Sequence, residues 1–313
     1  MTSLIITVYN ERKTLPEWLA SIMQQSVVPD EIVIVDGGST DGTWEWLEQQ
    51  ATAYPFLHVH QKKGNISVGR NEAICLAKGG YIVVTDAGCV YTKDWFETLA
   101  VAVKEHQFTA TAFGPWFTQD HGLVATLIAA ATTPASQEFK KDWLPSSRSV
   151  AFTKELWENA GKYPEWLPIC EDVVFDKSMI KLHGAPHYIR DPKVFWLPRP
   201  SLYAYMKQLF KYTKSEGHAY LNTNRQLIRY GVYGGSALLI YAAFLFSPWY
   251  LLGFVLAPVY LQKFYVRLFT FSKKNRIIGS LLLPIVVLLG DIAKMAGWPI
   301  GLAERIIGRV TPS

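Results

Sequence analysis

The residues best suited to chemistry lie in the stretch GYIVVTDAGCVYTKD, which runs from Gly80 to Asp94. An apolar run here leads directly into Asp86, and Ala87 and Gly88 follow it. Short apolar runs are typical of strands buried on both faces of a parallel sheet, and such sheets bind ligands beyond the carboxyl ends of their strands. The aspartate could therefore hold a hydrated metal or a large polar ligand. Alternatively, it is a turn residue that caps the following helix.

Two further groups of acids stand in similar settings. Asp36 ends an apolar run and begins the turn DGGSTDGT, whose glycines would let a ligand approach the backbone closely. Glu171 and Asp172 begin an amphipathic segment that ends at Gly184, and a carboxylate there could accept the proton of a reacting hydroxyl group. Both groups also have a structural interpretation, because turn carboxylates accept backbone N–H bonds and acids are favoured at helix N-termini.

Alternating strands and helices must position these acids. We predict strands over residues 3–8, 31–35, 56–60 and 81–84, and helices that begin near residues 15, 44, 67 and 95. Such alternation indicates βαβ units and a parallel sheet. The first turn, YNER, has neither GxGxxG nor GxxxxGK[ST], which argues against a dinucleotide dehydrogenase or a P-loop NTPase.

Composition excludes some classes of function. A net charge of +5 is too small and too dispersed to indicate nucleic-acid binding. The cysteines Cys75, Cys89 and Cys170 are far apart and form no CxxC motif. We therefore expect neither a disulfide framework nor a zinc site.

The C-terminal third is apolar. Residues 231–261 carry no charge and are interrupted by Ser247-Pro248, and residues 277–290 are apolar again. Because one membrane span needs about 20 residues, the first stretch predicts either a tilted span or a tight hairpin around Pro248. A pair of soluble core helices is the alternative. Five basic residues separate the two apolar stretches: Lys263, Arg267, Lys273, Lys274 and Arg276. They should stay on the cytoplasmic side, which a hairpin allows if the catalytic domain is cytoplasmic as well.

The motifs TVYNE, VDGGSTDGT, GRNEA, TDAGC and CEDVVF occur in this order and together resemble those of family 2 glycosyltransferases of the GT-A fold. The resemblance covers roughly residues 1–220. It implies an α/β, Rossmann-like GT-A fold with a mostly parallel sheet flanked by helices, followed by C-terminal membrane-associated helices. We expect the catalytic domain over residues 1–222 and a hydrophobic helical region of two or three apolar segments over residues 223–313.

The resemblance also implies roles for single residues. Asp172, beside Glu171, would be the catalytic base of an inverting transfer, and the guanidinium of Arg70 suits a diphosphate. Asp86 matches the first acid of the family's DxD motif and would bind Mg²⁺ or Mn²⁺. The expected nucleotide-sugar site consists of Thr7, Tyr9, Glu11, Asp36, Arg70, Asp86, Ala87 and Gly88.

The sequence departs from the family pattern at two positions. Gly37 stands where a second Asp often reads the base, so the base could be uracil or guanine. Gly88 stands in place of the second acid of DxD, so that water or a histidine such as His183 or His187 would have to supply the missing metal ligand.

The implied function is a membrane-attached glycosyltransferase with its catalytic domain facing the cytoplasm. It would move a sugar from a UDP- or GDP-sugar to a hydroxyl group or to a polyprenyl-linked or envelope-glycan acceptor. Because the apolar segments are too few to line a polymer channel, we expect a non-processive enzyme. Two alternatives remain open. A nucleotidyltransferase would usually show a glycine- and arginine-rich loop in place of TVYNERKT, and a non-catalytic membrane scaffold would explain Gly37 and Gly88.

Overall fold

The protein divides into two compact units. The computed structural model describes residues 1–117, 121–135, 138, 143–274 and 276–311, without the side chains of residues 254–257. Unit 1 is built from Met1–Trp116 and Ser136–Leu197, and unit 2 from Phe117–Ala135 and Pro198–Thr311. The domain boundary that we expect at residue 222 stays a prediction.

Unit 1 is organised around one sheet. Within the described residues the sheet has eight strands in the order β3-β2-β1-β4-β7-β6-β8-β5. Strands β1 to β4 are parallel, whereas β7 runs antiparallel to β4 and β6, and β5 runs antiparallel to β8. The predicted mostly parallel α/β sheet is thus confirmed. The strands are β1 (Thr2–Val8), β2 (Glu31–Asp36), β3 (Leu57–Gln61), β4 (Tyr81–Thr85), β5 (Cys89–Tyr91), β6 (Phe108–Pro115), β7 (Val150–Thr153) and β8 (His187–Trp196).

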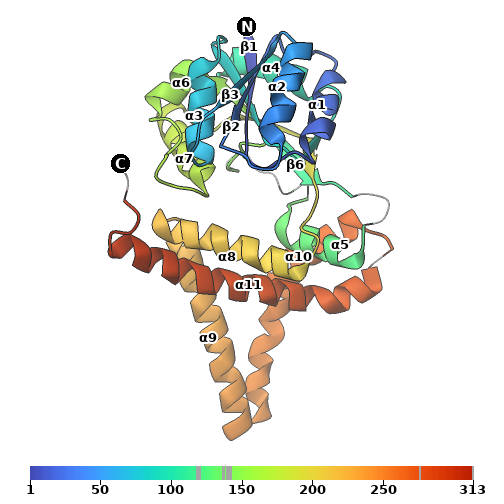
Figure 1. The fold of residues 1–313 in the computed structure, drawn as a ribbon. Coiled ribbons are helices and arrows are strands. Elements are labelled where there is room, and N and C mark those ends of the chain that lie inside the picture. Colours follow the sequence, from blue (N-terminus) through green and yellow to red (C-terminus); the bar gives the residue numbers. More distant parts are fainter. Residues whose placement is uncertain (118–120, 136–137, 139–142, 275, 312–313) are drawn as a thin grey trace. The chain divides into compact units, whose positions relative to one another are not determined.

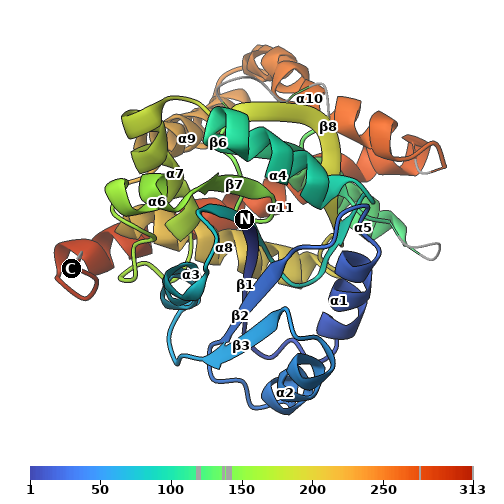
Figure 2. The same cartoon turned by 90° about the horizontal axis from the view of Figure 1, so that it is seen from above.

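Helices cover both faces of this sheet (Figure 2). In β1, Leu4 and Ile6 pack into a core with α1, α2 and α4, while Ile5 faces the opposite core with α3, α6 and α7. The central strands are buried on both faces, and the side chains of each face pack into one of the two cores. These strands are therefore apolar along their whole length. The helices of unit 1 are α1 (Leu15–Met23), α2 (Thr43–Ala53), α3 (Ile66–Leu76), α4 (Trp95–His106), α6 (Lys154–Asn159) and α7 (Glu171–His183).

The third helix begins at Ile66, within one residue of its predicted start. Its cap is Asn65, whose side chain accepts a hydrogen bond from Val68 N at 3.1 Å, and not Ser67. Ser67 lies inside the first turn and is fully buried. Both residue types favour caps, so the sequence pattern alone did not separate them.

Unit 2 is helical. It consists of α5 (Leu123–Thr132), α8 (Leu202–His218), α9 (Thr223–Leu245), the 3₁₀ helix η2 (Pro248–Leu256), α10 (Ala257–Phe271) and α11 (Arg276–Ile306). Helices α8 and α11 run side by side, and α9 turns back at Pro248 into η2 and α10 (Figure 1). Of the two interpretations of residues 231–261, the structure therefore shows the hairpin. By length and composition alone, Thr223–Leu245 and Arg276–Ile306 could each cross a membrane.

Candidate functional site

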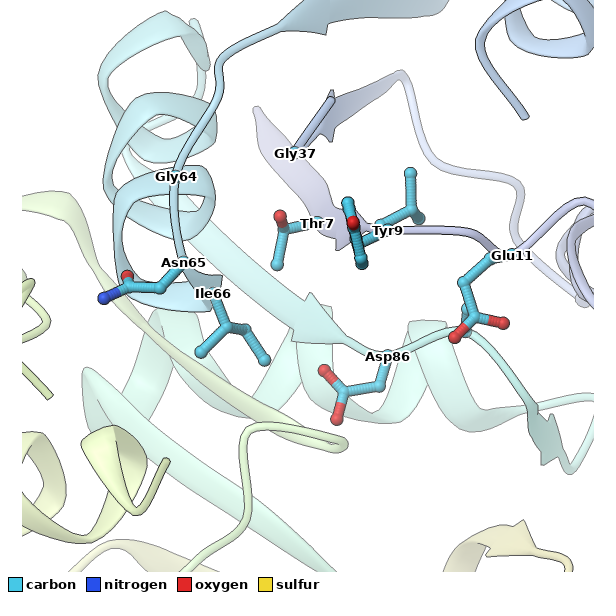
Figure 3. A pocket seen from close by; sticks show the side chains of 10 residues that line it. Thr7, Tyr9, Glu11, Gly37, Gly64, Asn65, Ile66 and Asp86 are labelled. Atoms are coloured by element: carbon cyan, nitrogen blue, oxygen red, sulfur yellow. The ribbon is translucent and has the colours of Figure 1, made fainter. Parts of the chain in front are cut away.

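A pocket of about 260 Å³ opens in unit 1, where β1 and β4 end. The residues that line it come from the end of β1 and from the segments that follow β1, β2, β3 and β4 (Figure 3). Five residues expected from the sequence line it, namely Thr7, Tyr9, Glu11, Asp86 and Ala87. The other lining residues are Val8, Gly37, Gly64, Asn65 and Ile66. The pocket thus lies at the carboxyl edge of the parallel strands, where such sheets bind ligands.

Close packing of α3 against β1 fixes one wall of this pocket. A Cβ atom on Gly69 would lie 2.0 Å from Thr7 Oγ1, so only glycine fits here. The Thr7 hydroxyl in turn donates a hydrogen bond to the carbonyl of Val35 at 3.1 Å. The glycine of the GRNEA motif therefore positions a residue that lines the pocket.

Asp36 is buried in its own turn. Its side chain is inaccessible, and its Oδ2 accepts hydrogen bonds from Ser39 N at 3.0 Å and from Gln61 Nε2 at 3.0 Å. Ser39 Oγ donates to Oδ1. Asp36 shapes the Gly37 turn and does not line the pocket, so its contact with a nucleoside stays a prediction.

Arg70 is the electrostatic centre of the site. Its side chain is buried, Nη2 donates to Asp86 Oδ1 at 2.7 Å, and Nη1 donates to Glu171 Oε1 at 2.5 Å. The guanidinium also lies 5.3 Å from the ring centre of Tyr163. Burial lowers the pKa of Arg70, but Asp86 and Glu171 more than offset this, so the pKa lies above its ordinary value. Arg70 is thus a fixed cation that joins two acids from distant parts of the sequence.

Asn65, which caps α3, and Asn71, within α3, hold the segment that precedes α7. Asn65 Nδ2 donates to the carbonyl of Glu165 at 2.6 Å, and Asn71 Nδ2 donates to the carbonyl of Tyr163 at 2.9 Å. Asn71 Oδ1 accepts a hydrogen bond from Tyr163 N at 3.0 Å. Neither asparagine was expected in the site, although Gly64-Asn65 is a turn signal at the carboxyl end of a predicted strand.

Helix α7 begins with two acids in different environments. Burial, with a contribution from neighbouring Asp172, raises the pKa of Glu171 to about 7, although Arg70 opposes this rise. One turn further on, Asp176 is fully buried, and burial together with Asp172 raises its pKa well above the ordinary value. Asp172 lies between them and is partly exposed. It is therefore the acid of this group that solvent or a ligand can reach.

Arg148 supplies a second cation beside Asp86. Its Nε lies 3.7 Å from Asp86 Oδ2, its Nη1 donates to Ser146 Oγ at 3.2 Å, and its guanidinium lies 4.6 Å from the ring centre of Trp196. The side chain is 29% exposed, whereas that of Arg70 is 2% exposed. Arg148 can therefore reach a ligand without losing its position. Its contact with Asp86 was not predicted from the sequence, because only the fold brings the two residues together.

Comparison with known proteins assigns part of the chain to a family. The profile "Glycosyl transferase family 2" matches residues 3–145, which contain β1 to β6 and Asp86. Residues 3–145 belong to this glycosyltransferase family. The family resemblance of the first four motifs, which lie within these residues, is thereby confirmed.

Two characterised relatives differ in how much of the chain they match. Glycosyltransferase GlyG of Streptococcus pneumoniae is 32% identical over 108 residues, which cover 34% of this chain and 36% of the relative. The matched part thus spans about a third of that protein. The dolichol-phosphate mannosyltransferase of Pyrococcus furiosus is 23% identical over 257 residues, which cover 78% of this chain and 71% of the relative.

A solved structure confirms the predicted GT-A fold. The mannosyltransferase PcManGT from Pyrobaculum calidifontis, solved with GDP-Man and Mn²⁺, superposes with a TM-score of 0.54 at 18% identity. The likeness covers 97% of this chain and 86% of that one. At this identity it shows the shared fold and nothing further about ligands.

Gly88, which stands in place of the second acid of the DxD pattern, is exposed with φ of 75°, a left-handed conformation that glycine adopts without strain.

The suggestion that His183 or His187 completes a metal site was wrong. His187 stacks on His106 at 3.8 Å and pairs with Thr109, where β6 and β8 begin. Asp86 follows the end of β4, and β4 runs in the same direction as β6, so these histidines lie at the opposite edge of the sheet. Among the described residues, no group of three or more His, Cys, Asp or Glu could hold a metal ion.

Proposed function

We propose that the protein is a membrane-attached, inverting and non-processive hexosyltransferase that uses a UDP- or GDP-sugar. The observation that carries this proposal is the pocket at the carboxyl edge of the sheet, lined by Thr7, Glu11 and Asp86, within residues of the glycosyltransferase family. The nucleoside would lie near Thr7, Tyr9 and Gly37, where the absence of a side chain leaves the backbone accessible.

The diphosphate would lie beside Asp86 and Arg148. Arg148 is a partly exposed cation beside Asp86. Arg70 is buried, and it holds Asp86 and Glu171 in position. A direct contact between Arg70 and the diphosphate stays a prediction. In this arrangement Arg148 would stabilise the charge that develops on the leaving group.

The donor set of the pocket fits a weakly held Mg²⁺ or Mn²⁺. Asp86 offers one carboxylate, and its Oδ1 already accepts a hydrogen bond from Arg70. These ions are often held by one or two carboxylates, with water and substrate phosphates as the remaining ligands. Asp86 would therefore hold the ion, which would supply charge neutralisation at the diphosphate.

We assign the role of catalytic base to Asp172. It is partly exposed at the N-terminus of α7, and its neighbour Glu171 is already engaged by Arg70. The Asp172 carboxylate would accept the proton of the acceptor hydroxyl as that oxygen attacks the sugar. Glu171 would act through Arg70, which fixes the start of the helix that carries Asp172.

The proposed acceptor is a hydroxyl or phosphate group on a lipid-linked or envelope glycan. Two observations support it: two apolar helices in unit 2, and a relative named for dolichol phosphate that aligns with 78% of the chain. A cytoplasmic orientation of unit 1 is part of this proposal and follows from the basic residues near α10.

The test is donor binding and transfer by the full chain in detergent, with a panel of UDP- and GDP-sugars and with or without Mn²⁺. We expect one donor class to bind, Asp86→Ala to weaken that binding, and Asp172→Asn to retain binding while transfer falls by about 10²–10⁴-fold. If no nucleotide sugar bound under any condition, the scaffold alternative would take precedence. If Asp172→Asn transferred at the normal rate, the assignment of the base would be wrong.

A further inference from the structure

The hairpin formed by α9, η2 and α10 exposes large apolar side chains where it turns. Phe244 is 87% exposed, Phe246 75% and Trp249 76%. The two arms are packed closely, because a Cβ on Gly253 of η2 would lie 2.5 Å from a methyl carbon of Leu239 in α9. Figure 1 shows the hairpin extending away from α8 and α11. A rigid apolar projection of this kind is expected to be covered by an apolar partner.

The opposite end of the hairpin is polar. Asp291 of α11 is fully buried, and it accepts hydrogen bonds from the hydroxyl groups of Tyr233 in α9 and Tyr260 in α10. It also pairs with Arg229 at 3.2 Å and with Lys294 at 3.1 Å. Both arms of the hairpin are thus joined to α11 at Asp291. We call this position, with its charged partners, the charged level.

The hairpin is too short to cross a bilayer. From Tyr233, at the charged level, to Leu245, at the end of α9, the helix extends roughly 18 Å at about 1.5 Å per residue. The hydrocarbon core of a bilayer is about 30 Å thick. With the charged level at the membrane surface, the turn at Pro248 would remain inside the membrane.

Helix α11 is long enough to span, but its packing excludes a span. Its C-terminal half lies along α8, where a Cβ on Gly301 would come within 1.8 Å of the Lys214 carbonyl oxygen. Glu304 pairs with Lys214 at 2.7 Å and with His218 at 2.8 Å. A helix that carries exposed lysines such as Lys211 does not lie in hydrocarbon, so the half of α11 that packs on it does not either. The remaining residues, 276–289, extend only about 21 Å.

The free face of α11 is nevertheless apolar. Exposed residues recur at helical spacing along its length, namely Ile277, Leu281, Ile285, Leu288, Ile292 and Ile300. A helix with one packed face and one exposed apolar stripe suits the surface of a membrane, where the stripe enters the boundary between headgroups and acyl chains.

From these observations we propose that unit 2 is a monotopic membrane anchor. The hairpin α9–η2–α10 enters the bilayer and returns to the same surface, and α11 lies along that surface instead of crossing. The partner is a bilayer with anionic headgroups, because Arg225, Lys263, Lys273 and Arg276 are exposed near the ends of the inserted elements. The proposal rests on the membrane attachment assumed for the proposed function, but it assigns a topology that does not depend on transfer.

The test uses single added cysteines in the full chain, reconstituted into sealed vesicles and treated with a membrane-impermeant maleimide. Cys75 is exposed in unit 1 and reports the side on which that unit lies. The added probes are Trp249→Cys at the turn, Lys273→Cys between α10 and α11, and Thr311→Cys after α11. Labelling of each site is read by peptide mass spectrometry before and after the vesicles are permeabilised with a pore-forming toxin.

We expect the probes at positions 273 and 311 to react together with Cys75 in sealed vesicles, and the probe at 249 to react in neither condition. Labelling at 273 only after permeabilisation would show that α9 crosses, and the same result at 311 alone would show that α11 crosses. Labelling at 249 after permeabilisation would show a spanning hairpin. Labelling at 249 in sealed vesicles would show a hairpin outside the membrane. Each of these four results overturns the proposal and leaves the transferase assignment unaffected.

Discussion

Arg70 dominates the site at the scale of single residues, because one buried guanidinium neutralises acids from two distant motifs. Replacing it with alanine would leave the buried Glu171 without its cation, and Asp86 would keep only Arg148, at 3.7 Å. Breaking a buried pair in this way costs about 3–5 kcal/mol. We therefore expect Arg70→Ala to lower the free energy of unfolding of the full chain by this amount, measured by urea unfolding in detergent with tryptophan fluorescence.

A matched control tests the importance of burial. Lys62 and Glu72 form an ion pair at 3.8 Å, and the side chain of Lys62 is 52% exposed. Exposed pairs of this kind contribute about 0–1 kcal/mol to stability. Lys62→Ala should therefore change the midpoint of urea unfolding little. An equal decrease in the free energy of unfolding of Arg70→Ala and Lys62→Ala would contradict the central role of Arg70.

Glu171 should make stability depend on pH. Burial raises its pKa from 4.5 to about 7, so the folded protein holds this proton more tightly than the unfolded chain does. The resulting stabilisation is complete below pH 4.5 and is lost as the pH rises through about 7, at about 1.4 kcal/mol for each pKa unit. Glu171→Gln cannot ionise. The free energy of unfolding of Glu171→Gln, minus that of wild type, should therefore increase between pH 5 and pH 8. A difference that stays constant over this range would contradict the raised pKa.

The residues of the site differ in how far the sequence could predict them. Asp86 was predicted because it follows an apolar strand, and parallel strands bring their carboxyl ends to one edge. Thr7 and Glu11 were expected from the family resemblance, and they line the same pocket. The burial of Arg70 was not foreseen, because its partner Glu171 lies far along the chain. The contact between Arg148 and Asp86 was not predicted for the same reason.

At the scale of elements, the close packing of α3 against β1 shapes the pocket. Gly69→Ala would place a methyl group 2.0 Å from Thr7 Oγ1, so either β1 or α3 must move. Because Thr7 lines the pocket, we expect Gly69→Ala to weaken nucleotide-sugar binding at least tenfold, measured by calorimetry. Gly80→Ala is the matched control, since a Cβ at Gly80 would meet nothing within 4 Å. Equal affinities of the two variants would show that the contact of α3 with β1 does not shape the pocket.

The elements themselves were predicted with uneven success. The bounds of β1, β2, β3 and β4 agree with the predicted strands to within one residue, because strands buried on both faces appear as apolar runs between turn residues. The sequence analysis did not predict that β7 lies antiparallel between β4 and β6. Such a pairing joins segments far apart in the chain, and nothing local in the sequence encodes it.

At the scale of the whole molecule, the apolar turn of the hairpin should control membrane binding. A charged side chain within the membrane costs about 2.5–3.5 kcal/mol, so the double variant Phe246→Asp with Trp249→Asp should reduce the vesicle-bound fraction by tenfold or more. The measurement is flotation of the full chain with anionic vesicles. Val101→Asp with Leu182→Asp adds the same charge at exposed apolar positions of unit 1, and it should leave flotation unchanged. Equal flotation of the two double variants would mean that the hairpin does not anchor the protein.

The return of the hairpin to its starting surface also restricts what happens to a product. A membrane segment that does not cross the bilayer offers no polar path through it, and moving a sugar through hydrocarbon would leave its hydroxyl groups without hydrogen-bond partners. A lipid carrying a newly added sugar would therefore remain on the face where it was made. Its export to the opposite face would require a separate flippase.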